Sequence, residues 1–454
     1  MSRMVAQRLC YNADVAEPRI VSRAEHPISR RDIDPDALKV LYRLRQFDHV
    51  AYLVGGSVRD LLLGRRPKDF DIGTSAHPYQ VKKLFRNCWI IGRRFRLAHV
   101  RFGSKVIEVA TFRRQVEPGE EIVAEGVPAP VPAESEHRPR AHEGGDAHLI
   151  HRDNTFGTPE EDAFRRDFTI NALFYDIATF SVIDYVGGLD DLRAGIVKAI
   201  GDPEVRMRED PVRMMRAVAL GARLDFRIDP PVLEAIRRHR RELARSSAPR
   251  LLEEYYKILR AGSAEKAFRD LAHLGLLEPI SKELHEGAAD PLWRSLAGLD
   301  AYRRRFESSP DTLTNAILLG TLLVPLGVPL HPARQPTPTD GAFDRRRPQG
   351  PRLGELPLAR RDIERLRQIL GLGHRLRDLT ASPRAQRAMT HRSIFGDALT
   401  WLEIHGRSPE VVEHWKGVLV GEGNAGAVEP AAEAEPLPRR RRRRRRRRFR
   451  PAPQ

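Results

Sequence analysis

Two aspartates stand one residue apart in the segment "DFDI", at Asp69 and Asp71. On a strand, residues i and i+2 face the same side, so both carboxylates would point together while Phe70 points into the core. Neighbouring carboxylates repel each other unless a cation lies between them, and hard oxygen ligands suit Mg²⁺. The pair therefore indicates a site for two Mg²⁺ ions, replaceable by Mn²⁺, of the kind that supports phosphoryl transfer. Taken alone, the pair also fits a solvated face or a turn.

A glycine turn precedes the aspartates, at Gly55, Gly56 and Ser57. Glycines let backbone N–H groups approach a phosphate, and the start of a helix favours negative charge. The Ser57 hydroxyl can donate a hydrogen bond to the same phosphate, and Arg59 follows on the first helical turn. Glu108, between apolar neighbours in "VIEVATF", is the candidate for a third carboxylate. We expect the turn and the carboxylates to form one phosphate- and metal-binding unit.

Alternating helix and strand patterns must position these residues. The patterns predict helices over 35–47, 57–64 and 79–85, and strands over 51–54, 69–72, 97–102 and 106–112. Helical patterns dominate from residue 210 onward and are typical of a bundle or array. We therefore predict an α+β chain, in which a small domain with a mixed sheet is followed by all-helical domains and a disordered basic tail.

The charge of the chain is concentrated at its C-terminal end. The 454 residues carry a formal charge of +17, but an unbroken run of ten arginines at 439–448 and Arg450 account for eleven of these charges and leave +6 for the rest. Such a tail fits RNA binding, with steep salt dependence, or a solubility or localisation role.

Two cysteines form neither a disulfide framework nor a zinc cluster, which is typical of a reducing compartment. The most apolar stretch, 316–330, is interrupted by Pro325 and Pro329 and is shorter than the roughly 20 residues of a membrane span. We interpret it as a buried helix that ends at a proline. The sequence thus predicts a cytoplasmic protein without integral membrane association.

Four ordered segments resemble one family of enzymes. "GGSVRD…DFD" is followed by "EEDAFRRDFTINALFYD" (160–176), "DYVGGLDDLRAG" (184–195) and "REDPVRMMRAV" (208–218). Together they are similar to the class II nucleotidyltransferases of the DNA polymerase β-like superfamily, which include bacterial poly(A) polymerases and CCA-adding enzymes. "IIGRRFRLAHVRFG", "IEVATFRR" and the Arg-rich end favour the poly(A) polymerase branch. "RAVALGARLDF" departs from the family pattern, which usually has another Arg and a Phe after the Val.

The resemblance implies roles for the matching residues. Asp69 and Asp71 would be the metal ligands, and Asp167 in "RRDFT" would be the next acidic residue of the catalytic site. The other matching residues would bind the nucleotide: Arg165, Arg166 and Asn171 the triphosphate and ribose, and Glu209, Asp210, Arg213 and Arg216 the incoming base.

Spacing supports part of this assignment without the resemblance. Asp210, Arg213 and Arg216 stand at i, i+3 and i+6, which is broadly one face of a helix, and Pro211 suits a first helical turn. An acceptor and a donor held together can read a base edge. The alternatives are an ion pair that only braces the helix and, for Asp167, an ion pair with Arg165 or Arg166.

The resemblance also implies the activity and its partners. The expected reaction is template-independent polyadenylation: the RNA 3′-hydroxyl attacks the α-phosphate of ATP, AMP is added and pyrophosphate leaves, with two Mg²⁺ ions at the site. A CCA-adding enzyme and a catalytically inactive RNA-binding protein on the same fold are the alternatives. RNA 3′ ends and ATP are the expected partners, with RNA-degradation or RNA-chaperone proteins as further candidates.

The same reasoning divides the chain into five parts. They are a flexible segment (1–32), a catalytic head (33–176) with a mobile insertion at about 115–148, a neck that binds base and RNA (177–262), a helical RNA-binding body (263–420) with a loop at about 331–358, and a disordered linker and tail (421–454).

Overall fold

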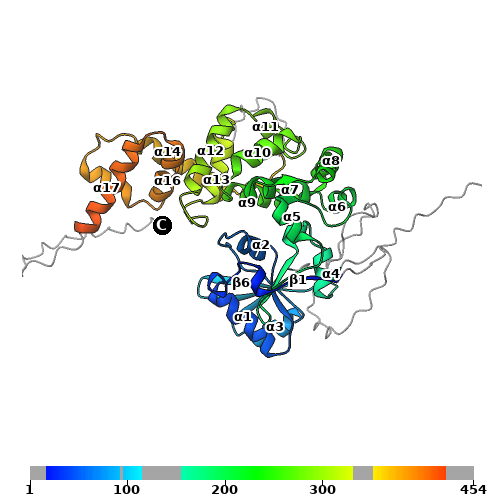
Figure 1. Cartoon of the computed structure of the whole chain (residues 1–454). Helices are drawn as coiled ribbons and strands as arrows, with labels where there is room; N and C mark the ends of the chain where they lie inside the picture. The colour runs from blue at the N-terminus through cyan, green and yellow to red at the C-terminus, as the bar shows by residue number, and fades with distance from the viewer. Residues whose placement is uncertain (1–16, 93–95, 115–154, 331–350, 426–454) are drawn as a thin grey trace, which may run out of the picture.

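The computed structural model describes residues 17–92, 96–114, 155–330 and 351–425. It confirms the α+β class: a mixed sheet with helices is followed by a part built almost wholly of helices (Figure 1). The predicted insertion, most of the predicted loop at 331–358 and the Arg tail lie outside the described residues.

An eight-stranded sheet, counted within the described ranges, forms the head. Its strand order is β1-β8-β7-β2-β3-β6-β5-β4, and the pair β3 and β6 is parallel while all its other neighbours are antiparallel. The strands are β1 (Arg19–Val21), β2 (Ala51–Val54), β3 (Ile72–Thr74), β4 (Cys88–Ile91), β5 (Leu97–Phe102), β6 (Lys105–Thr111), β7 (Leu173–Asp176) and β8 (Ser181–Asp184).

One face of the sheet is covered by α1 (Pro35–Gln46) and α3 (Pro78–Leu84), which lie at the lower end of the head in Figure 1. The α1 helix begins where the Asp34 carboxylate accepts hydrogen bonds from the N–H groups of Asp36 and Ala37, at 2.8 and 3.4 Å. Its apolar residues recur at helical spacing and pack into the core: Ala37, Val40, Leu41 and Leu44.

The opposite face carries a smaller apolar cluster with Val54, Phe112 and Phe174 at its centre. Gly73 on β3 leaves room for it, because a Cβ there would lie 2.6 Å from Phe112 Cε1 and 2.9 Å from Val54 Cγ1. The helices α2 (Gly56–Leu62) and α4 (Pro159–Phe164) and the α5 helix (Gly188–Ala194) complete the head.

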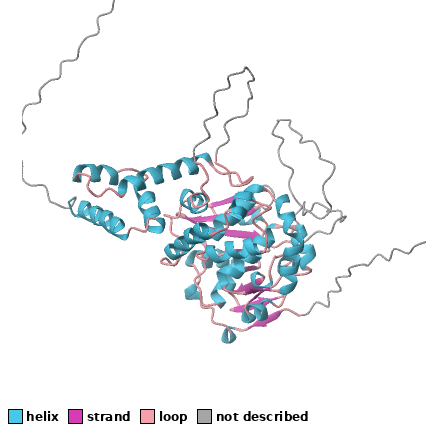
Figure 2. Cartoon of the chain, turned by 90° about the horizontal axis from the view of Figure 1, so that it is seen from above, coloured by secondary structure: helices cyan, strands magenta, loops and turns pink. Residues whose placement is uncertain are grey.

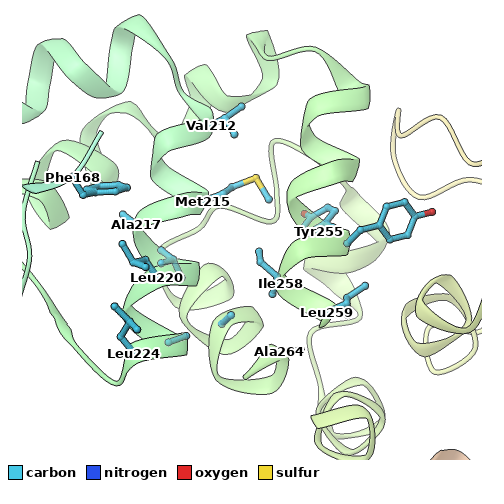
Figure 3. Packing of buried hydrophobic residues seen from close by; sticks show 14 of the residues in the cluster. Phe168, Val212, Met215, Ala217, Leu220, Leu224, Tyr255, Ile258, Leu259 and Ala264 are labelled. Atoms are coloured by element: carbon cyan, nitrogen blue, oxygen red, sulfur yellow. The ribbon is translucent and has the colours of Figure 1, made fainter. Parts of the chain in front are cut away.

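The helical part continues the main core of the head. Phe168, which follows α4, points toward the α7 helix (Val212–Leu224), whose Met215 extends toward α9 (Ala248–Arg260) (Figure 3). The remaining elements are β9 (Ile196–Val197), α6 (Pro203–Glu209), β10 (Arg227–Ile228), α8 (Pro230–His239), α10 (Ala264–His273), α11 (Lys282–Glu286), α12 (Asp290–Arg303) and α13 (Asn315–Leu323).

A second core holds the C-terminal helices together. It contains Trp415, whose indole Nε1 donates a 2.8 Å hydrogen bond to the Leu376 carbonyl, and Phe395, whose ring meets Trp415 edge-on. These helices extend to one side of the molecule (Figure 2). They are α14 (Arg360–Leu376), α15 (Pro383–Thr390), α16 (Phe395–His405) and α17 (Pro409–Ala425).

Three predicted boundaries are wrong. The expected strand over 69–72 begins only at Ile72, so the two aspartates lie in the segment just before β3. The segment 1–32 is not wholly flexible, because β1 pairs with β8 at the sheet edge. The α17 helix continues past residue 420 to Ala425.

The apolar stretch at 316–330 behaves as predicted. The α13 helix ends at Leu323, before Pro325, and its residues Ala316–Leu323 are buried. Across the described ranges, the search for a helix with the length and hydropathy of a membrane span finds none.

We predict that Gly73→Ala destabilises the head. The added methyl group would clash with Phe112 and Val54, which are buried on both sides, and overpacking of this kind costs about 1–3 kcal/mol. Chemical denaturation followed by circular dichroism measures the loss. Gly371→Ala is the control, because this exposed position in α14 has open space around it and the helix gains about 0.5–1 kcal/mol. Equal effects of both changes would contradict the packing argument.

Candidate active site

A cleft of about 850 Å³ lies between the head and the helices α7 and α9. All the predicted site residues line it except Glu108 and Glu209. The structure therefore brings together side chains from four sequence segments: the glycine turn, the Asp69–Asp71 region, residues 165–171 and the start of α7.

The backbone conformation of the turn requires glycine at position 55. Gly55 has φ +70°, and a Cβ there would lie 2.9 Å from Nη1 of Arg166. Gly55 also donates its N–H to the Leu173 carbonyl at 3.0 Å, which fixes the turn to β7. The Ser57 hydroxyl donates to the Val54 carbonyl at 3.0 Å and is buried. The predicted phosphate donor is thus engaged within the chain, while the backbone of Gly55 and Gly56 faces the cleft.

The acidic edge of the cleft arises from the parallel pairing of β3 and β6. Because Ile72 is in register with Val109, the residues that precede them, Asp71 and Glu108, are neighbours. Loss of solvation and repulsion from Glu108 and Asp69 raise the pKa of Asp71 to about 6, although Arg166 opposes the shift. The fold therefore holds like charges together at this edge.

This edge offers the donor set that a hard cation needs. Within the described ranges, no group of three or more His, Cys, Asp or Glu side chains is arranged as a metal site. Two carboxylates suffice for Mg²⁺, however, because it completes its shell with water and substrate phosphates. Their mutual repulsion would be relieved by a divalent ion, so Asp69 and Asp71 fit the group. Among the described contacts of these acids, Lys68 Nζ lies 3.7 Å from Asp69 and the imidazole Nε2 of His99 lies 3.6 Å from Glu108.

A buried carboxylate that the sequence analysis missed anchors two arginines of the cleft. Oδ1 of Asp162 accepts two hydrogen bonds from the Arg165 guanidinium, at 2.6 and 2.9 Å. Its Oδ2 accepts two from the Arg166 guanidinium, at 2.9 and 3.1 Å. Burial alone would raise the pKa of Asp162, but Arg166 and Arg165 outweigh it and hold that pKa below its usual range. The ion pair considered earlier between Asp167 and one of these arginines is absent from the described contacts.

Asp167 lies among guanidinium and amide groups. One oxygen accepts from the Phe168 N–H at 2.8 Å and from Asn171 Nδ2 at 3.2 Å, and the other lies 2.7 Å from Arg216 Nη2. Burial would raise the pKa of Asp167, but these partners, led by Arg216, hold it low. The charges that act on Asp71 are those of Glu108, Asp69 and Arg166. A catalytic role for Asp167 stays a prediction.

The prediction that Asp210, Arg213 and Arg216 share one helical face is wrong for Asp210, which lies outside the helix. Asp210 is extended, with φ −141° and ψ 91°, between α6 and α7, and α7 begins at Val212. Its Oδ2 pairs with Arg250 Nη2 of α9 at 2.7 Å, while Oδ1 is buried without a hydrogen-bond partner in the described structure. Asp210 therefore lines the cleft and keeps one acceptor oxygen, Oδ1, buried and unsatisfied within the described structure.

The pair that does form at the start of α7 joins Arg213 to Glu209, at 3.0 Å. Glu209 also pairs with Arg206 at 3.0 Å, and Arg213 Nη1 donates to the Arg206 carbonyl at 2.9 Å. Arg213, which is predicted to bind the base, is thus buried and held in place by Glu209, which is predicted to bind the base with it.

Several cleft residues were not predicted. Asp60 is buried and accepts from Arg59 at 2.7 Å and from Arg223 of α7 at 2.5 Å. Its place next to Arg59 in "VRD" was the available signal. Four further ones are cations of α9 and α12, namely Arg250, Lys257, Arg260 and Arg303, and α9 also brings Glu253 and Glu254 to the cleft. The helical spacing of the three on α9 could have revealed a basic face.

Two parts of the sequence match known family descriptions. Residues 51–198 match "Poly A polymerase head domain", and residues 225–287 match "Probable RNA and SrmB- binding site of polymerase A". The similarity to a poly A polymerase head domain covers residues 51–198. The head domain thus contains the glycine turn, the acidic edge and the arginine pair, and it accounts for the resemblance seen in the sequence.

Curated relatives with two different names match this chain. The chain is 50% identical over 268 residues to "Poly(A) polymerase I" of Salmonella typhi, covering 59% of this chain and 54% of that protein. It is 33% identical over 244 residues to "CCA-adding enzyme" of Bacillus velezensis, covering 54% and 55%. The chain spans about half the length of the curated relatives it matches.

The fold of the head domain and the adjoining helices is shared with a solved structure. The CCA-adding enzyme of Bacillus stearothermophilus in complex with CTP superposes with a TM-score of 0.51 at 24% identity, over 86% of this chain and 83% of that chain. At this identity the likeness shows the fold alone.

We predict that Asp162→Asn loosens the arginine pair of the head domain. An amide cannot balance two guanidinium groups, and breaking a buried ion pair costs about 3–5 kcal/mol of unfolding free energy. Denaturation of both proteins measures the difference. Asp190→Asn is the control: Asp190 is exposed and pairs with exposed Arg19 and Arg193, so the change should stay within about 0.5 kcal/mol.

The same substitution has a defined pH dependence. Because the folded-state pKa of Asp162 lies below its ordinary value of 3.8, its stabilisation is present above about pH 4 and is lost as the pH falls through the folded pKa. The stability gap between wild type and Asp162→Asn should therefore be full near neutral pH and narrow on acidification. A gap that stays constant down to low pH would show that the Asp162 charge does not carry the effect.

Proposed function

We propose that this protein transfers AMP from ATP to the 3′-hydroxyl of RNA without a template and releases pyrophosphate. The observation that carries the proposal is that one cleft joins an acidic edge, with Asp69 and Asp71, to a wall of guanidinium groups. The first arrangement suits a divalent cation and the second suits a triphosphate and an RNA strand. The name of the Salmonella typhi relative supports the same reaction.

The side chains of the cleft divide the work by charge. Arg165 and Arg166 are held by Asp162 and oriented toward the site, where they would neutralise the triphosphate. The turn at Gly55 and Gly56 would offer backbone N–H groups to the same phosphates. Positioning of this kind supplies most of the catalysis in phosphoryl transfer, because the bonds themselves change with little help from the protein.

Base selection is assigned to the wall formed by α7. The free Oδ1 of Asp210 can accept a hydrogen bond from an exocyclic amino group of the base. Arg213 lies beside it and is fixed by Glu209. Protein side chains would thus take the place of a template, with Arg216 close to the nucleotide through its pair with Asp167.

Asp69 and Asp71 would hold Mg²⁺, or Mn²⁺ in its place, and two ions are proposed. When bound, they would supply a lowered pKa for the attacking RNA hydroxyl and countercharge for the departing pyrophosphate. Glu108 would add negative charge beside Asp71. RNA would follow the cations of α9, which belongs to the segment that matches an RNA- and SrmB-binding region.

Protein partners from RNA degradation or RNA chaperoning are part of the proposal, since the matched description also names SrmB. A cytoplasmic site of action is proposed from the absence of a disulfide framework in the sequence.

A CCA-adding activity is the second candidate, since the Bacillus velezensis relative carries that name. Labelled ATP or CTP, offered with transfer RNA that lacks its end or with a generic RNA, separates the two activities. Long A tails on generic RNA are expected here. Incorporation that stops after C, C and A on transfer RNA would replace polyadenylation by CCA addition.

We predict that Asp69→Asn/Asp71→Asn lowers kcat for AMP incorporation by more than about 10³-fold, since the charge stabilisation supplied by bound metal ions is worth several kcal/mol. The protein should fold normally, because Asp69 has an exposed side chain and removal of the repulsion at Asp71 costs nothing. Asp190→Asn/Asp225→Asn is the matched control, with the same charge change at two exposed positions. Unchanged incorporation by a folded Asp69→Asn/Asp71→Asn protein would refute the metal role.

A further inference from the structure

A second hollow of about 860 Å³ lies on the head domain, outside the cleft. Helix α1, the end of helix α3 and the strands β4 and β5 enclose it, and we call it the α1–α3 groove. Figure 1 shows α1 and α3 at the end of the head that points away from α7 and α9. Its cationic lining residues are Lys39, Arg43, Lys82, Lys83 and Arg86, and its aromatic ones are Tyr42, Phe85 and Phe102.

The groove has a strong excess of positive charge. No carboxylate is among its lining residues within the described ranges. Lys82, Lys83 and Arg86 are exposed and form no ion pair with any described residue. Lys39 pairs with Asp36 outside the groove at 2.8 Å. Unpaired cations that share a concave surface repel one another and attract a polyanion.

Aromatic rings alternate with these cations. Tyr42, on α1, is 45% exposed. The Arg43 guanidinium lies 5.8 Å from the centre of the Phe85 ring, and Lys39 Nζ lies 5.7 Å from that of Phe102. Phe85 and Phe102 are half-buried against the core, so Tyr42 is the accessible ring of the groove. A groove with cations and an accessible ring suits single-stranded nucleic acid, because the phosphates meet the charges while a base stacks on the ring. The Arg tail, by contrast, has only Phe449 beside its arginines.

We propose that the α1–α3 groove is a second binding site for single-stranded RNA. That the groove holds the RNA strand to which AMP is added rests on the proposed function. RNA binding by the groove does not depend on that function. An acidic protein segment would also satisfy the cations, but it would leave the exposed Tyr42 ring unused. A duplex would hide its bases from this ring.

The charge contribution is tested by Lys82→Gln/Lys83→Gln in the full-length chain. Fluorescence anisotropy with labelled oligo(A), without ATP, gives the affinity over a series of KCl concentrations. Loss of two phosphate contacts should reduce the slope of log K against log salt by about 1.4, since each contact contributes about 0.7 for a single strand.

Arg19→Gln/Arg193→Gln is the matched control for this experiment. It removes the same charge from two exposed arginines that pair with Asp190, and Arg19 lies on β1, at the opposite sheet edge from β4. Its slope should equal that of the wild type. Equal slopes for the wild type and for Lys82→Gln/Lys83→Gln would overturn the proposal.

Stacking is tested at Tyr42. Tyr42→Ser should weaken oligo(A) binding about tenfold, in the range found for loss of one base–aromatic stack, and leave the salt slope and duplex RNA binding unchanged. Tyr42→Phe keeps the ring and loses only the hydroxyl that accepts from Arg30, so it should bind like the wild type. Two results together would make the proposal wrong. Tyr42→Ser would bind oligo(A) like the wild type, and poly-glutamate would displace the RNA from the wild type but not from Lys82→Gln/Lys83→Gln. The groove would then bind an acidic protein partner.

The experiment separates this inference from the catalytic one. The same binding measurements on Asp69→Asn/Asp71→Asn protein require no AMP transfer, so they hold even if the chain proves inactive. If transfer occurs, Lys82→Gln/Lys83→Gln should raise KM for RNA several-fold and leave kcat and KM for ATP unchanged. A change in kcat alone would contradict a binding role.

Discussion

The arginines of the cleft stand close together only because carboxylates lie between them. Guanidinium groups repel one another, and a buried unpaired charge costs several kcal/mol. The structure meets this constraint three times with one arrangement, in which a single acid is shared by two arginines: Asp60 by Arg59 and Arg223, Asp162 by Arg165 and Arg166, and Glu209 by Arg206 and Arg213. Each set retains one net positive charge, so the wall stays attractive to phosphate while every guanidinium is held in a fixed direction. Such preorganisation costs no reorganisation when a charged substrate arrives.

The acidic edge follows the opposite logic. Among the described contacts, Asp69, Asp71 and Glu108 have no close, buried cation as a partner. The pKa of Asp71 is raised to about 6, because its carboxylate loses solvation and is repelled by Glu108 and Asp69. The parallel register of β3 and β6 enforces this proximity, and the antiparallel neighbours of these two strands hold them in the middle of the sheet. The cleft therefore carries unbalanced negative charge on one side and compensated positive charge on the other. That asymmetry suits a substrate in which cations accompany an anionic triphosphate.

The sequence was sufficient for the fold class, and most of the site residues that it predicted do line the cleft, because glycine, aspartate and arginine motifs report local chemistry directly. It was insufficient where an element depends on distant contacts. Asp69 and Asp71 look like strand residues by alternation, but β3 gains its partners only from Ile72 onward. The break at Asp210 had a local cause that was overlooked, since a residue before proline avoids helical backbone angles. The partnership of Asp60 with Arg223 joins positions 163 residues apart, so neither spacing nor composition could reveal it.

The contacts that charge the cleft also set the position of the head against the helices. Arg223 of α7 reaches Asp60 of α2, Arg216 of α7 reaches Asp167, and Arg206 Nη2 of α6 donates to the Arg165 carbonyl at 2.8 Å. Away from the cleft, the described contacts between these parts include a fully exposed pair, Arg66 with Glu307, which contributes little. The apolar contact of Phe168 with α7 adds stability, but it does not fix the orientation of the head relative to α7. Because Arg216 and Arg223 both line the cleft and join its two walls, the proposed nucleotide binding and the relative position of the walls would depend on one set of ion pairs.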